Sequence, residues 1–114
     1  MRHLNDVALA PNQREVLAEL RRRLSVEFEI EGVVLFGSAA RGEADEESDL
    51  DLLILTKKPL TRPVRHQITD LIFEVNLRHG TNFSSLVIDR ENWERGTASV
   101  LPIHDEIVRD GVPV

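Results

Sequence analysis

Apolar positions along this chain change their spacing several times, and each change marks a predicted element. Before Ala10 there is little periodicity, so we expect a loose start. From Pro11 to about Phe28 apolar residues recur every three or four positions, which is the period of an amphipathic helix. Either Pro11 in the first turn, or Asn12 as N-cap with Glu15 three residues later, would open this helix.

Short apolar runs predict three strands. Residues 29–32 are expected to turn the chain into the first strand, whose centre is the run 33–36. The second strand is expected over residues 49–56 and is ended by the Lys-Lys-Pro segment 57–59. A third is predicted over residues 83–88.

Helical spacing returns after the second strand. A helix from about Pro63 is expected to stop at Gly80, a residue suited to a left-handed C-terminal position. A short helix capped by Asp89 or Asn92, and a last helix over 102–109, complete the pattern. This order predicts an α/β (α+β) fold with a small mixed β-sheet flanked by helices.

Gly37 and Ser38 follow the first predicted strand directly. Glycine lets the backbone turn sharply and approach a ligand closely, because it has no Cβ. If a short helix begins here, Ser38 would be its N-cap, and the free N–H groups of the first turn would face an anion such as a triphosphate. The alternative is an ordinary strand-to-helix turn.

Asp49 and Asp51 alternate along the second predicted strand, so their side chains share one face. Their Cα atoms should lie roughly 6.5 Å apart, and both carboxylates could then reach one cation. Mg²⁺ prefers one or two carboxylates together with phosphate oxygens and water. The alternative is a solvated acidic strand end that follows the acidic run 43–47.

The combined pattern G-S-x-x-R-G-x5-S-D-x-D-L over residues 37–52 resembles the DNA polymerase beta-like nucleotidyltransferase superfamily, in particular its minimal branch of MntA-type antitoxins. By that resemblance, Gly37 and Ser38 would hold the nucleotide phosphates. Asp49 and Asp51 would be the catalytic ligands of Mg²⁺. The remaining members of the expected nucleotide-binding set are Arg41 and Ser48. For Arg41 the alternative is a salt bridge to the acidic loop.

The resemblance implies a single minimal nucleotidyltransferase domain over residues 1–114. Its expected reaction transfers AMP from ATP to a hydroxyl group of a partner protein. Minimal members resemble antitoxins paired with a helical RNase-like toxin of the HEPN class, so such a toxin is the expected partner. The chain is too short to add a second substrate-binding domain, which disfavours transfer to a small molecule such as an aminoglycoside.

Active members of this superfamily usually carry a third acidic residue on a neighbouring strand. Serines 84 and 85 stand where that residue is expected. Asp89 at the strand's end ranks first as a substitute metal ligand, ahead of Glu74 and Asp70 in the preceding helix. Each could instead be a helix-surface or capping residue. The alternative function is therefore a catalytically degenerate binding module, which neutralises or scaffolds a partner by contact.

The net charge of −6 at pH 7 argues against a protein that grips nucleic acid through its backbone. The basic cluster 21–23 is expected on the solvent side of the first helix, with RNA or an acidic partner as alternatives. The absence of cysteine excludes disulfides and thiolate metal sites, and the four histidines lack metal-ligand spacing. Without a signal-like start or a long apolar segment, we expect a cytoplasmic protein without a membrane segment; its oligomeric state stays open.

Overall fold

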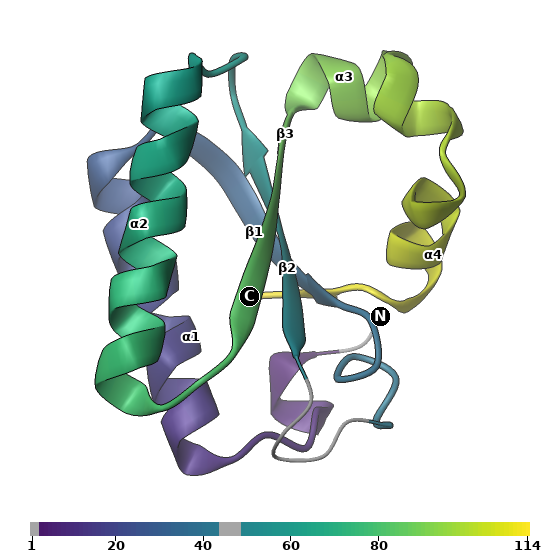
Figure 1. Cartoon of the computed structure of the whole chain (residues 1–114). Helices are drawn as coiled ribbons and strands as arrows, with labels where there is room; N and C mark the ends of the chain where they lie inside the picture. Colours follow the sequence, from purple (N-terminus) through teal and green to yellow (C-terminus); the bar gives the residue numbers. More distant parts are fainter. Residues whose placement is uncertain (1–2, 44–48) are drawn as a thin grey trace.

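The computed structural model describes residues 3–43 and 49–114. Helices and strands are interspersed along the chain (Figure 1). The elements are η1 (Leu4–Asp6), α1 (Pro11–Glu27), β1 (Ile30–Phe36), β2 (Leu50–Thr56), α2 (Arg62–His79), β3 (Phe83–Asp89), α3 (Arg90–Arg95), η2 (Thr97–Val100), α4 (Pro102–Asp110) and β4 (Val112–Pro113). No helix in the described ranges is long and apolar enough to cross a membrane.

Within the described residues the sheet has four strands in the order β3-β2-β1-β4. β1 runs antiparallel to both β2 and β4, whereas β3 runs parallel to β2. A parallel pair needs a crossover connection, and α2 supplies it between β2 and β3. The predicted mixed sheet flanked by helices is therefore confirmed.

The helices divide between the two faces of the sheet (Figure 1). α1 and α2 pack on one face, where Leu50 and Leu52 of β2 join the main hydrophobic core. α3 and α4 lie on the other face, where Leu53 packs with Ile107 of α4. Because side chains alternate along a strand, Asp51 lies on the face covered by α3 and α4.

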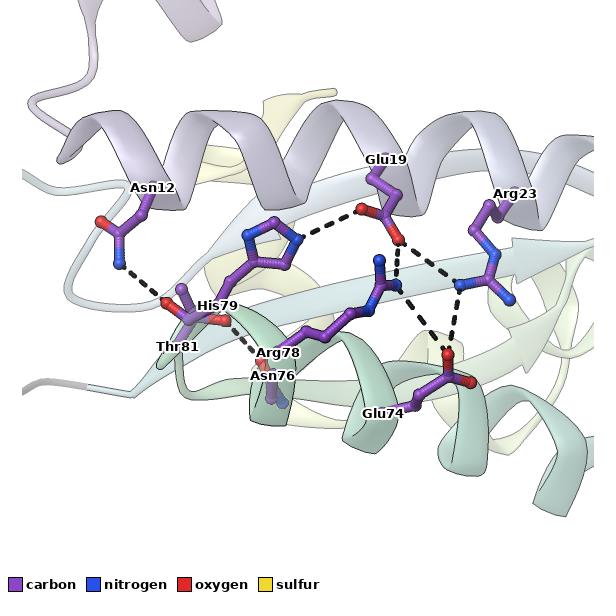
Figure 2. A network of polar contacts seen from close by, with 8 residues as sticks. All are labelled: Asn12, Glu19, Arg23, Glu74, Asn76, Arg78, His79 and Thr81. Carbon is purple, nitrogen blue, oxygen red and sulfur yellow. Dashed lines mark hydrogen bonds and ion pairs between the residues drawn. The ribbon is translucent and has the colours of Figure 1, made fainter.

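A network of polar contacts joins α1 to α2 (Figure 2). Oε2 of Glu19 lies 2.6 Å from Nη2 of Arg78, and Oε1 of Glu19 lies 3.3 Å from Nε2 of His79. Nη1 of Arg23 lies 3.4 Å from Glu19 and 4.0 Å from Glu74. Burial raises the pKa of Glu19, but the surrounding cations outweigh burial and the pKa is lowered. The ionised form of Glu19 therefore stabilises the packing of these two helices.

Two predicted helix boundaries take the expected form. Gly80 ends α2 in the left-handed region, with φ at 67°, and its N–H donates to the carbonyl of Asn76. Asp89 caps α3, because its Oδ2 accepts a hydrogen bond of 3.0 Å from the N–H of Asn92. Of the two residues proposed for this cap, Asp89 is the one that serves.

The structure differs from the predicted pattern in three places. The described part of the start is not loose, because Val7 is buried in the main core and its carbonyl accepts a hydrogen bond from Arg14. β1 begins at Ile30 rather than after Gly32, with a register irregularity between these two residues. β4 carries no periodicity of its own, since two residues are too few for an alternating pattern, and it forms by pairing with β1.

Candidate active site

Strand pairing brings the two halves of the 37–52 motif together at one end of the sheet. Phe36, the last residue of β1, pairs with Asp51 of β2, and Gly37 follows Phe36 directly. β3 reaches the same end, where Ser84 pairs with Asp51. The glycine-serine turn and the aspartates therefore lie side by side.

Gly37 is required here for two separate reasons. Its φ of 79° lies in the left-handed region, which favours glycine. In addition, a Cβ built at this position would lie only 2.4 Å from Oδ2 of Asp51. The backbone of the turn therefore approaches the Asp51 carboxylate more closely than any residue with a side chain would permit.

The segment after Gly37 forms turns, so the short helix that Ser38 would have capped is not formed in the described residues. The N–H of Arg41 donates to the Gly37 carbonyl at 3.2 Å, and the N–H of Glu43 donates to the Ser38 carbonyl at 2.9 Å. Gly42, with φ at 75°, reverses the backbone before a second helical turn can form. In the described part of the chain, the N–H groups of residues 38–40 donate no hydrogen bond. Unused donors of this kind suit an anion.

Asp49 and Asp51 flank the buried Leu50, so both carboxylates project away from the main core. Asp49 is exposed just before β2 begins, and Asp51 is partly buried within it. Burial is the main cause that raises the pKa of Asp51, and the negative charges of Asp49 and Glu106 raise it further. Arg41 acts in the opposite direction. The site concentrates negative charge that a divalent cation would neutralise.

Arg41 connects the turn to α4. Its Nη1 lies 2.9 Å from Oε1 of Glu106, and its Nε lies 3.2 Å from Oε2 of Glu43. The hydrogen bond to Glu43 is the main cause that raises the pKa of the Arg41 guanidinium. Sequence reasoning misses Glu106, because the two partners are 65 residues apart and no local pattern marks their contact. A positive charge is thus held near Asp51.

The candidate substitutes for a third carboxylate lie away from Asp51. Asp89 pairs with Thr56 at the opposite end of β3, and its carboxylate is used to cap α3. Glu74 and Asp70 belong to α2, which packs on the other face of the sheet. These three acids are therefore not part of the candidate site. Asp89 is separated from Asp51 by the length of β3, and the sheet lies between Asp51 and the two acids of α2.

The strand position next to Asp51 is occupied by Ser84. Paired residues of neighbouring strands point to the same face, so the exposed Ser84 side chain lies on the side of Asp51. Ser85 pairs with Leu52 and points to the opposite face. Of the two serines singled out in the sequence, Ser84 is the one that stands where a third carboxylate would be placed.

The donor set fits a metal bound together with a nucleotide better than a metal alone. Within residues 3–43 and 49–114, no group of three His, Cys, Asp or Glu side chains could hold a metal ion. Asp49 and Asp51 would supply two ligands for Mg²⁺, leaving the remaining positions to phosphate oxygens and water. Ser48, predicted to bind nucleotide, lies outside the described residues.

Comparison with known proteins assigns the chain to a family. The chain matches the model of the nucleotidyltransferase domain over residues 14–108, a range that includes Gly37, Asp49 and Asp51. The chain therefore belongs to the nucleotidyltransferase domain family.

Two similar curated proteins come from Methanocaldococcus jannaschii. "Putative protein adenylyltransferase MJ1305" is 36% identical over 78 residues, which are 65% of this chain and 53% of that protein. "Putative protein adenylyltransferase MJ0141" is 33% identical over 75 residues, which are 64% of this chain and 76% of that protein. The match thus spans about half the length of the first relative.

Solved structures share the fold at low sequence identity. One, described as a "putative minimal nucleotidyltransferase", superimposes with a TM-score of 0.63 and 24% identity, covering 90% of this chain and 92% of that one. Another, described as "the toxin-antitoxin with AMP-PNP", gives a TM-score of 0.59 and 15% identity, covering 91% of this chain and 72% of that one. These likenesses establish the nucleotidyltransferase fold.

Proposed function

We propose that this chain transfers AMP from ATP to a hydroxyl group of a partner protein. The observation that carries the proposal is the close approach of the Gly37 turn, which would hold phosphates, to Asp51, which would hold Mg²⁺: a Cβ built on Gly37 would lie only 2.4 Å from Oδ2 of Asp51. A turn that held phosphates would have to lie close to the carboxylates that held Mg²⁺, because this ion prefers one or two carboxylates together with substrate phosphates. The adenylyltransferase names of the two curated relatives support the same class of reaction.

Each residue has a distinct role in the proposed reaction. The unused N–H donors of residues 38–40 and the guanidinium of Arg41 would orient the phosphates. Asp49 and Asp51 would hold Mg²⁺, whose charge neutralises the phosphates when it is bound. The oxygen of the acceptor hydroxyl would bond to the α-phosphorus of ATP as the bond from that phosphorus to the β-bridging oxygen breaks. The proton of the hydroxyl would pass to water, and pyrophosphate would leave.

We infer that the acceptor is a toxin, and that the chain acts as its antitoxin. Two structural neighbours are described as toxin-antitoxin assemblies, with TM-scores of 0.59 and 0.55. The resemblance of the 37–52 motif to minimal nucleotidyltransferases favours a helical toxin of the HEPN class. AMP on a catalytic or substrate-binding hydroxyl of such a toxin would silence it.

A second function is favoured by one specific observation. Ser84 occupies the strand position beside Asp51, and the nearby Glu106 is engaged by Arg41. Among the described residues this leaves Asp49 and Asp51 as the carboxylates of the site, with no evident base for the acceptor proton. Under this alternative the chain still holds a nucleotide but neutralises its partner by contact alone.

The deciding experiment follows label from ATP to a purified helical candidate toxin. With Mg²⁺ and ATP labelled at the α-phosphate, we expect label on the partner and a mass increase of one AMP. ATP labelled at the γ-phosphate should leave no label, because that phosphate departs in pyrophosphate. The double variant Asp49→Asn/Asp51→Asn should abolish transfer while remaining folded. Neutralisation of the partner without any transferred AMP would select the contact-only function.

A further inference from the structure

The edge strand β3 presents backbone groups outward. In a parallel ladder, alternate residues of a strand bond to the same neighbour. The N–H of Leu50 donates to the carbonyl of Asn82 at 2.9 Å, so the even-numbered residues of β3 bond to β2. The N–H and C=O groups of Phe83, Ser85 and Val87 therefore point away from the sheet.

Side chains of α2 cover part of this outward edge. Nδ2 of Asn76 donates to the Phe83 carbonyl at 2.9 Å, and the N–H of Phe83 donates to Oδ1 of Asn76 at 3.0 Å. The Asn76 amide thus imitates a neighbouring strand at this one residue. Nη2 of Arg65 makes only a long contact of 3.5 Å with the Val87 carbonyl. The edge from Ser85 to Val87 is otherwise open in the described structure.

A groove of about 490 Å³ runs along the open edge. β3 contributes residues 85–87, and α2 contributes Arg62, Arg65, His66 and Thr69. All four α2 side chains are exposed. The groove therefore offers a row of backbone donors and acceptors on one wall and cationic side chains on the other.

The charge of the groove is opposite to that of the protein. The chain carries a net charge of −6, and several of its arginines are engaged by carboxylates. In the described residues, neither Arg62 nor Arg65 forms an ion pair. These two cations are thus available to a ligand that carries negative charge.

We propose that the β3 edge binds an extended, acidic segment of a partner protein, which pairs with residues 85–87 as an additional strand. Alternating backbone donors and acceptors match another polypeptide, since a strand offers the complementary alternation. Carboxylates of the bound segment would pair with Arg62 and Arg65. A nucleic-acid phosphate backbone would satisfy the arginines but has no donors for the outward carbonyl groups. The docked segment would begin one residue from Ser84, and therefore beside the candidate active site.

The proposal is tested with a labelled peptide that alternates glutamate and valine over about ten residues, the upper end of usual strand length. Fluorescence anisotropy should detect binding without ATP or Mg²⁺. A glutamine-valine peptide should bind at least about tenfold more weakly because it lacks the charges. A glutamate-valine peptide N-methylated at alternate residues on its pairing edge should also lose binding, since N-methylation removes the N–H donors.

Charge reversal in the protein supplies a matched control. Arg62→Glu/Arg65→Glu should weaken binding of the acidic peptide at least about tenfold. Arg22→Glu/Arg95→Glu applies the same total charge change to exposed arginines on α1 and α3 and should have a much smaller effect. Equal losses in the two double variants would mean that net charge, rather than this groove, attracts the peptide.

Hydrogen exchange distinguishes strand addition from loose electrostatic contact. Peptide binding should slow exchange of the Ser85 and Val87 amides at least about tenfold, because those N–H groups gain partners. The Ser84 and Leu86 amides already bond to β2 and should change less. The proposal is overturned if the peptide binds without protecting Ser85 and Val87, or if a single-stranded oligonucleotide binds the groove and the acidic peptide does not.

Discussion

Replacement of Gly37 by alanine should damage both the fold and the site. The methyl group must occupy a backbone conformation with φ at 79°, and it meets Oδ2 of Asp51 at 2.4 Å. The left-handed conformation alone costs a non-glycine residue about 1–2 kcal/mol. For a domain near this size, each kcal/mol lowers the melting temperature by about 4–8 °C.

The contact with Asp51 adds a functional effect to this loss of stability. Oδ2 must retreat by about 1 Å to reach an ordinary van der Waals distance from the new methyl group. A displacement of that size at a reacting centre can lower the rate about 10²-fold. We therefore expect Gly37→Ala to reduce AMP transfer, or Mg²⁺-dependent ATP binding, by about that factor.

Gly80→Ala separates the two effects. Gly80 has a similar φ of 67°, but a Cβ built there has no neighbour within 4 Å. This variant should lose stability by about the same 1–2 kcal/mol and keep nucleotide binding. Thermal unfolding and titration calorimetry of both variants make the comparison. If Gly37→Ala binds Mg²⁺-ATP as well as Gly80→Ala does, the close approach to Asp51 has no role in the site.

Three further predictions concern single side chains. The raised pKa of Asp51 means that its ionised form destabilises the metal-free protein as the pH rises through that pKa. Asp51→Asn should therefore raise the melting temperature at pH 7 while abolishing Mg²⁺-dependent ATP binding. A lowered melting temperature would contradict this expectation. Ser84→Asp should place a third carboxylate beside Asp51, and it should raise AMP transfer by about 10²-fold if a base is what the site lacks. An unchanged rate would mean that position 84 is not where the missing base belongs. The pKa of Glu19 is lowered, so the stability that its ionised form contributes is fully present above the ordinary pKa of 4.5 and is lost as the pH falls through the lowered pKa. Glu19→Gln should therefore lower the free energy of unfolding by about 1 kcal/mol at pH 7 and by little in strong acid. Urea unfolding at both pH values measures this difference.

The sequence by itself determined which residues face the same way within each element. The alternation of Asp49 and Asp51 around Leu50 follows from the two-residue period of a strand, and Gly80 ends α2 because glycine tolerates a left-handed backbone. These features depend on backbone geometry over a few residues. A local pattern is therefore enough to predict them.

Tertiary structure decided which distant residues meet at the site. The contact between Arg41 and Glu106, the pairing of Ser84 with Asp51 and the position of Asp89 at the far end of β3 all depend on strand register or helix packing. Register is set by how the faces of the sheet are buried against helices from other parts of the chain. No spacing within a single element records such a choice. The sequence singles out serines 84 and 85 for the third position, and strand pairing decides that Ser84 is the one beside Asp51.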